Sequence, residues 1–145
     1  MKTSSTFFYL SSILSAALAL PSTNPTARSP VGTEWSVYNY IEGCSPGGCV
    51  YGFNITRGSS PTNEPGFATY CSGTNVASKL QSCQDPTINS NEIPGTGNVA
   101  LVVQHKYTTE NGATYWVTGN TAVVDSDGQY PKAFSIKQSE IVAIL

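Results

Sequence analysis

The chain has 145 residues with seven basic and nine acidic side chains, so its formal net charge at neutral pH is −2. The Lys and Arg residues form no cluster that could neutralise a run of phosphates, which argues against nucleic-acid binding. The sequence also has no polybasic or amphipathic helical segment of the kind that holds a protein on a membrane surface.

The first 19 residues have the three parts of a signal peptide. A polar start with Lys2 precedes an apolar run over residues 7–20, and Ala17-Leu18-Ala19 supplies the small side chains that a signal peptidase recognises. The apolar run is about 14 residues, shorter than the roughly 20 that span a bilayer. We therefore predict cleavage after Ala19 and a secreted, extracellular protein without stable membrane insertion.

The rest of the chain divides into a short leader and one domain. Residues 20–33 carry three prolines among small polar residues, a composition typical of a flexible leader. Residues 34–145 then form a single β domain, which is long enough to bury one core.

All four cysteines follow the predicted signal peptide, at Cys44, Cys49, Cys71 and Cys83. An even number of cysteines in an oxidising compartment indicates two disulfides. Three pairings are possible, and we favour Cys44–Cys49 and Cys71–Cys83 because these partners are close in sequence. No second Cys or His pair is spaced to complete a four-ligand zinc site, so we expect no metal there.

Alternating apolar and polar residues predict β-strands through most of the domain. Asn111-Gly112 and Asp127-Gly128 mark tight turns, because Asn, Asp and Gly tolerate positive φ. Residues 72–91 are expected to be irregular, with one helical turn at residues 76–80. The fold class is therefore all-β, an antiparallel β-barrel or sandwich with two disulfides and about seven strands. The predicted strands cover residues 35–42, 50–56, 67–71, 98–107, 114–124, 134–136 and 141–145.

Aromatic side chains that face outward are the candidate binding groups. Strand alternation puts Trp35 on one face of the first strand and Tyr38 and Tyr40 on the other. Trp116 and Thr118 likewise lie opposite Tyr115 and Val117. On each strand one set must fill the core and the other must face water or a partner, unless the barrel buries both in part. We therefore predict a binding surface at Tyr38, Tyr40 and Trp116, because exposed aromatic rings bind sugars, apolar molecules and protein partners.

Asn54-Ile55-Thr56 is the only N-x-[ST] acceptor sequence for N-glycosylation. The alternation places Tyr51, Phe53 and Ile55 on the buried face of their strand. Asn54 should therefore point to solvent, where a glycan would not disturb the core.

Two patterns superficially resemble catalytic sites. Residues 43–47 match the G-x-S-x-G turn of secreted esterases around Ser45, but that turn needs a helix after it and an α/β fold. Here a second cysteine and another strand follow, which indicates a disulfide-braced turn. His105, the only histidine, continues the apolar face of Val99, Leu101 and Val103, so we expect a core residue.

The acidic residues predict neither a calcium site nor a pair of catalytic carboxylates. Residues 125–128 begin like a calcium-binding loop, but the twelfth position is Ile136, which is not a ligand. Acidic residues such as Glu64 and Glu92 are expected at strand ends or in solvated loops. We therefore predict no enzyme, no catalytic residue and no cofactor.

The order of these segments resembles a known family. A W-S-V-x-x-Y strand, a G-F-N-I-T strand and F-x-x-x-C-x(11)-C follow the signal peptide, and the most specific parts are residues 52–55 and Cys71, Leu80 and Cys83. The chain resembles fungal small secreted hypersensitive-response-inducing elicitor proteins and, more loosely, the β-barrel family of the major Alternaria allergen. It departs from the allergen at the local Cys44–Cys49 pair and in having no late cysteine pair.

The resemblance implies a protein of a plant-associated fungus that plant tissue perceives. Its partner would be a plant host protein or cell-surface component, and it would act by binding and not by catalysis. The alternative is a secreted β-barrel that holds a small apolar or sugar ligand.

Overall fold

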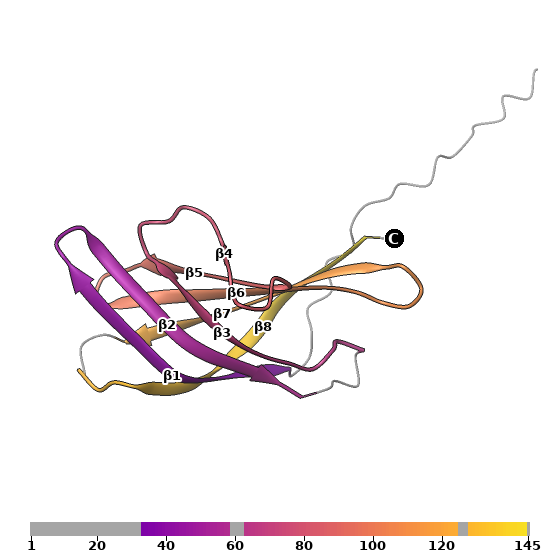
Figure 1. The fold of residues 1–145 in the computed structure, drawn as a ribbon, viewed down its shortest axis with the longest axis horizontal. Coiled ribbons are helices and arrows are strands. Elements are labelled where there is room, and N and C mark those ends of the chain that lie inside the picture. Colours follow the sequence, from indigo (N-terminus) through magenta and orange to yellow (C-terminus); the bar gives the residue numbers. More distant parts are fainter. Residues whose placement is uncertain (1–32, 59–62, 125–127, 145) are drawn as a thin grey trace, which may run out of the picture.

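The computed structural model describes residues 33–58, 63–124 and 128–144, and all of its regular structure is β (Figure 1). The predicted signal peptide and residues 20–32 of the leader lie outside the described residues. Among the described residues there is no helix long and apolar enough to cross a membrane. The strands are β1 (Glu34–Ser45), β2 (Gly48–Arg57), β3 (Phe67–Thr74), β4 (Gln81–Ser82), β5 (Ile88–Pro94), β6 (Asn98–Thr108), β7 (Thr114–Val124) and β8 (Lys132–Ile144).

The all-β prediction is confirmed, with three corrections to the elements. The two strands predicted at residues 134–136 and 141–145 form one continuous strand, β8. The segment predicted to be irregular, residues 72–91, contains the end of β3, all of β4 and the start of β5. The helical turn predicted at residues 76–80 is wrong, because this segment consists of turn and bend.

The strands form one antiparallel sheet in the order β3-β2-β1-β8-β7-β6-β5-β4. Every hydrogen-bonded pair consists of neighbours along the chain, except that β1 also pairs with β8. The sheet curls so far that β3 contacts β4 and β5 at its opposite edge. The result is a nearly closed up-and-down barrel with one seam, between β3 and the β4–β5 hairpin.

A disulfide crosses this seam. Cys71 on β3 is bonded to Cys83, which directly follows β4. Beside it, the Gln84 amide donates to the Tyr70 carbonyl and the Asp85 amide donates to the Thr69 hydroxyl, both at 2.9 Å. The other disulfide, Cys44–Cys49, joins directly opposite residues near the tip of the β1–β2 hairpin. Both predicted pairings are confirmed, and all four cysteines are used.

Bulky side chains fill the inside of the barrel. Tyr51, Phe53 and Ile55 of β2 point inward as predicted, and so do alternate residues of β6, including His105. The largest side chains with less than 2 % exposure are Trp35, Tyr40, Phe53, Ile55, Ile88, Leu101 and Ile136. Because these side chains come from five of the strands, the interior is a packed core.

A β-bulge in β1 reverses the predicted side of Tyr40. Pairing with β2 shifts by one position between Tyr38 and Ile41, and Asn39 lies in the left-handed region with φ of 54°. Asn tolerates this conformation, and the extra residue swaps the faces of the strand that follows. Tyr40 therefore points inward, which is the opposite of the prediction, and Ile41 points outward.

Candidate binding surface

Trp116 lies on the outer face of β7, between a lysine on one neighbouring strand and a valine on the other. Its register neighbours are Lys106 on β6 and Val142 on β8. The Lys106 ammonium lies 5.4 Å from the centre of the indole ring, a cation–π geometry. Ile144, in the next row, is 54 % exposed. We call Lys106, Trp116, Val142 and Ile144 the tryptophan patch.

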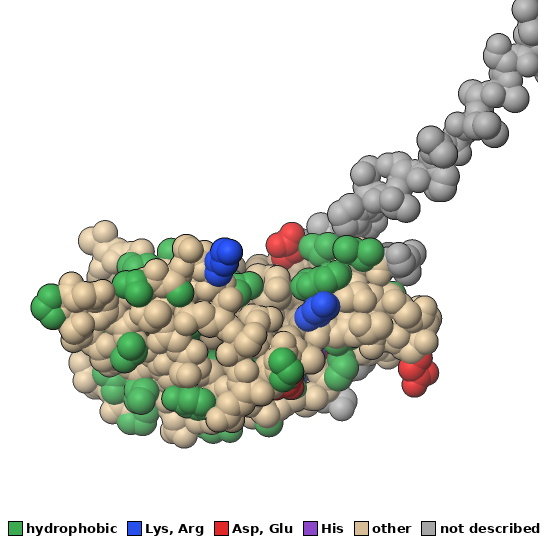
Figure 2. Space-filling view, turned by 45° about the horizontal axis from the view of Figure 1, so that its top comes forward, with side chains coloured by type: hydrophobic (Ala, Val, Ile, Leu, Met, Phe, Trp, Pro, Cys, Tyr) green, Lys and Arg blue, Asp and Glu red, His purple; other side chains and the backbone are tan. Residues whose placement is uncertain are grey.

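The tryptophan patch can anchor a partner. A half-buried indole with aliphatic neighbours offers a rigid apolar surface that loses little entropy on binding. Lys106 on one side and the exposed Glu140, paired with Thr118 in the next row, place charges of both signs beside it. In the view of Figure 2, charged side chains are few and lie among uncharged polar and hydrophobic ones. Sequence alternation predicted that Trp116 faces outward, but its neighbours Val142 and Ile144 followed only from the pairing of β7 with β8.

A second outer surface covers β1, β2 and β3. Tyr38, Asn54 and Tyr70 are directly paired across the three strands, with Tyr38 41 % and Tyr70 36 % exposed. Asn54 is half-buried and shares the outer face of β2, as predicted. Tyr70 was missed, although its alternation with the buried Cys71 would have found it. We call the outer surface around this row the tyrosine face.

Tyr40 does not belong to a binding surface, so its prediction is wrong. Its side chain is fully buried, and its hydroxyl donates a 2.5 Å hydrogen bond to Glu92 Oε1. Its ring packs against Phe53 and Phe134. Burial, followed by the hydrogen bond to Glu92, raises the pKa of Tyr40 far above its ordinary value. Glu92 is itself buried inside the barrel, so its predicted place in solvent is also wrong.

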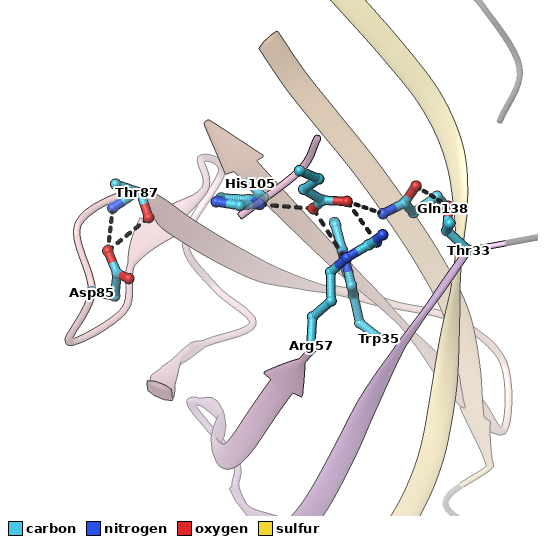
Figure 3. Close-up of polar contacts among 8 residues, drawn as sticks. Thr33, Trp35, Arg57, Asp85, Thr87, His105 and Gln138 are labelled. Atoms are coloured by element: carbon cyan, nitrogen blue, oxygen red, sulfur yellow. Dashed lines mark hydrogen bonds and ion pairs between the residues drawn. The ribbon is translucent and has the colours of Figure 1, made fainter. Parts of the chain in front are cut away.

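Glu64 organises a buried polar cluster that the sequence did not predict (Figure 3). One carboxylate oxygen, Oε1, accepts hydrogen bonds from Trp35 Nε1 at 3.3 Å and His105 Nδ1 at 2.7 Å. The other, Oε2, accepts from Gln138 Nε2 at 2.7 Å and lies 2.5 Å from Arg57 Nη1. Glu64 is only 2 % exposed, so its expected position in a solvated loop is wrong.

His105 is a core residue, as predicted, and its surroundings fix its ring. Phe67 and Tyr107 pack against it with ring centres 4.8 and 5.2 Å away, and Nδ1 is held by Glu64. On the other side of the ring lies the Asp85–Thr87 turn (Figure 3). Hydrogen bonds from the Thr87 hydroxyl and amide lower the pKa of Asp85.

Ser45 lies far from this cluster. It is ten residues beyond Trp35 on the same strand, a separation of about 30 Å in an extended chain. Its hydroxyl donates to the Gly48 carbonyl at 3.2 Å, within the hairpin turn. Figure 1 shows the tips of the β1–β2 and β6–β7 hairpins at opposite ends of the long axis. Ser45 and His105 therefore do not form a nucleophile–base pair.

Three other places were candidates: a carboxylate beside a disulfide, an acidic turn and a pocket. Glu42 lies beside Cys44 and Cys49, but both sulfurs are consumed by the disulfide and so provide no thiolate for a metal. The acidic residues of the predicted turn at 125–127 lie outside the described residues. An open pocket of about 380 Å³ lies between the end of β7 and the start of β8, with Val123, Lys132 and Phe134 in its lining.

Comparisons with known proteins gave no relatives. A scan against protein-family models, a search of curated proteins and a search of solved structures each found no match for this chain.

Proposed function

We propose that this protein is a secreted fungal elicitor or effector that plant tissue perceives, and that it acts by binding and not by catalysis. The fungal origin and the plant partner rest on the resemblance of its strand and cysteine order to hypersensitive-response-inducing elicitors. Two disulfides support secretion, because such bonds persist in oxidising compartments.

The observation that carries the binding mode is the tryptophan patch. The interior of the barrel is occupied by fully buried side chains, so recognition falls to the outer surface. Trp116 there combines an aromatic anchor with aliphatic flanks and a cation, the composition of a protein-binding hot spot. The expected partner is a plant host protein or cell-surface component with a complementary apolar pocket.

Leaf infiltration with the purified secreted protein tests this proposal. We expect local cell death, and we expect Trp116→Ala to need a dose about 30-fold higher, because losing a hot-spot side chain costs about 2 kcal/mol of binding energy. Ile93→Ala, on β5, is the matched control, since Ile93 is 52 % exposed and lies outside the patch.

N-terminal sequencing of the same secreted sample tests cleavage after Ala19.

Two results would contradict the proposal. One is the absence of any leaf response to correctly folded protein. The other is an equal dose response of Trp116→Ala and the unmodified protein, which would remove the tryptophan patch from recognition.

The pocket between β7 and β8 is the place to test the second candidate function, a carrier of a small apolar or sugar ligand. Its volume of about 380 Å³ is within the range of ligand sites, but it is open to solvent and its lining is mostly polar, with Val123 and Phe134 among its apolar members. Saturable binding of a fluorescent fatty acid, abolished by Ala122→Trp at the pocket wall, would support the carrier. If Ala122→Trp leaves the leaf response intact, the two functions are separate.

A further inference from the structure

The tyrosine face is an uncharged, exposed sheet surface with a glycosylation acceptor at its centre. Three rows cross β1, β2 and β3, and the middle row is Tyr38, Asn54 and Tyr70. None of the nine residues in these rows carries a charge, although surface strands ordinarily present charged residues to water. The flanking rows are Ser36, Thr56 and Ala68 on one side and Ile41, Gly52 and Ser72 on the other.

Both determinants of the acceptor sequence point to this face. Asn54 and Thr56 are two residues apart on β2, so their side chains share one side of the strand, while Phe53 and Ile55 are fully buried on the other. Thr56 is flanked by Ser36 and Ala68, whose side chains are short. The surface next to Asn54 is therefore low and open in the direction of Thr56.

The two tyrosines flank Asn54 on the neighbouring strands. The Tyr70 ring leans across Gly52, where a β-carbon would lie 2.3 Å from the Tyr70 hydroxyl. The ring therefore lies along the sheet and leaves part of its face in solvent. Tyr38, on the opposite side of Asn54, is 41 % exposed. Aromatic faces of this kind pack against the C–H groups of sugar rings and exclude water from them.

We propose that Asn54 carries an N-linked glycan and that the first sugars of this glycan pack against Tyr70 and Tyr38. In the transfer step, the Asn54 side-chain nitrogen forms a bond to C1 of the first N-acetylglucosamine of a lipid-linked diphosphate oligosaccharide. The bond between C1 and the diphosphate oxygen breaks, the lipid diphosphate leaves, and the amide nitrogen gives up one proton. The chain's own neutral glycan then covers the tyrosine face.

The glycan fits this face better than an external partner does. It is anchored at the centre of the row and so reaches both tyrosines without the entropy cost of association. It is neutral, like the surface beneath it. The tryptophan patch lies on other strands, β6, β7 and β8, so a glycan on β2 leaves that patch open.

Occupancy is tested by intact-mass analysis of the full chain secreted from yeast. Glycosylation requires export, and so does the proposed elicitor function. The chain is therefore expressed with an added N-terminal export signal, so that a failure of its own signal peptide does not count against glycosylation at Asn54. We expect one glycan, lost in Thr56→Val and retained in Thr56→Ser, because serine preserves the acceptor sequence. A mass equal to the bare polypeptide, unchanged by Thr56→Val, would overturn the inference.

Packing on the tyrosines is tested by comparing melting temperatures. We expect the glycosylated protein to melt about 3–6 °C above Thr56→Val, since such a shift corresponds to a few aromatic–sugar contacts in a domain of this size. In a Tyr70→Leu background this difference should fall by half or more, and in a Tyr70→Phe background it should persist. An equal difference in all backgrounds would show that the glycan is present but does not pack on Tyr70, which contradicts the second half of the inference.

Discussion

Glu64, three residues before β3, lies buried inside one end of the barrel. Its carboxylate accepts hydrogen bonds from Trp35, His105 and Gln138 and pairs with Arg57, whose side chain is 6 % exposed. We expect Glu64→Ala to lower the free energy of unfolding by about 3–5 kcal/mol, because Arg57 is left as a buried charge without its counter-ion. Urea denaturation monitored by tryptophan fluorescence measures this.

The exposed Glu110 is the matched control for this prediction. Glu110→Ala, in the β6–β7 hairpin, should change stability by less than about 0.5 kcal/mol. Replacing both members of the pair, as Arg57→Met with Glu64→Leu, should cost less than Glu64→Ala alone. A loss below about 1 kcal/mol in Glu64→Ala would show that water reaches Arg57 and that the cluster is not sealed.

Tyr40 makes stability depend on alkaline pH. Burial raises the pKa of Tyr40 above its ordinary value of 10.0, and the same is true of Tyr51 and Tyr107. Below pH 10 the folded and unfolded chains both keep these protons, so stability is fully present. Above pH 10 the unfolded chain releases protons that the folded chain retains, so stability falls as pH rises.

Tyr40→Phe removes one of the hydroxyl groups whose proton is released on unfolding above pH 10. We expect the fall in unfolding free energy between pH 10 and 11.5 to become shallower by about 1.4 kcal/mol per pH unit. Urea titrations at several pH values compare this slope with that of the unmodified protein. Equal slopes would mean that Tyr40 ionises in the folded state and that its hydrogen bond to Glu92 does not hold the proton.

At the scale of single elements, sequence alternation worked where one face is wholly apolar. It correctly oriented β2 and β6, whose inward residues are almost all aliphatic or aromatic. It missed β5, because two of the inward positions there are Ser90 and Glu92. These side chains are satisfied by Tyr51 and Tyr40 on distant strands. A polar residue with a distant partner looks like a loop residue when only its neighbours in sequence are considered.

The bulge in β1 explains the remaining error of orientation. The bulge at Asn39, which has positive φ, reverses the side on which the later residues of β1 lie. Tyr40 therefore lies in the core and not on the predicted binding surface. Trp116 and Tyr38 do face outward. No bulge lies between either residue and its buried neighbour, Val117 or Val37, so simple alternation holds there. Sequence alternation therefore located two of the three predicted surface aromatics.

At the scale of the whole molecule, the polar cluster could not be predicted. His105 and Gln138 are 41 and 74 positions away from Glu64, and only the closing of the barrel brings them together. The pairing of β1 with β8 is equally non-local, since the strand at one end of the domain meets the strand at the other. The two disulfides were predictable because their partners are separated by only 5 and 12 positions.

The Cys71–Cys83 disulfide is the covalent closure of the barrel. It joins β3 to the end of β4 across the one junction that lacks a strand ladder in the described sheet. We expect the Cys71→Ser/Cys83→Ser variant to lose about 3 kcal/mol of unfolding free energy, and Cys44→Ser/Cys49→Ser about 2 kcal/mol, since the loops closed contain 12 and 5 residues. Urea denaturation of both variants measures the two losses.

Hydrogen exchange separates a loss at the seam from a general loss of stability. Without Cys71–Cys83, the Gln84 and Asp85 amides that bond to Tyr70 and Thr69 should lose protection first, because little else holds the β3 edge to the β4–β5 hairpin. The amides of β6 and β7 lie in the middle of the sheet with long ladders and should exchange only by global unfolding. Uniform acceleration along the chain, or a larger effect from removing Cys44–Cys49, would mean that the barrel is held closed by its core and not by the bond across the seam.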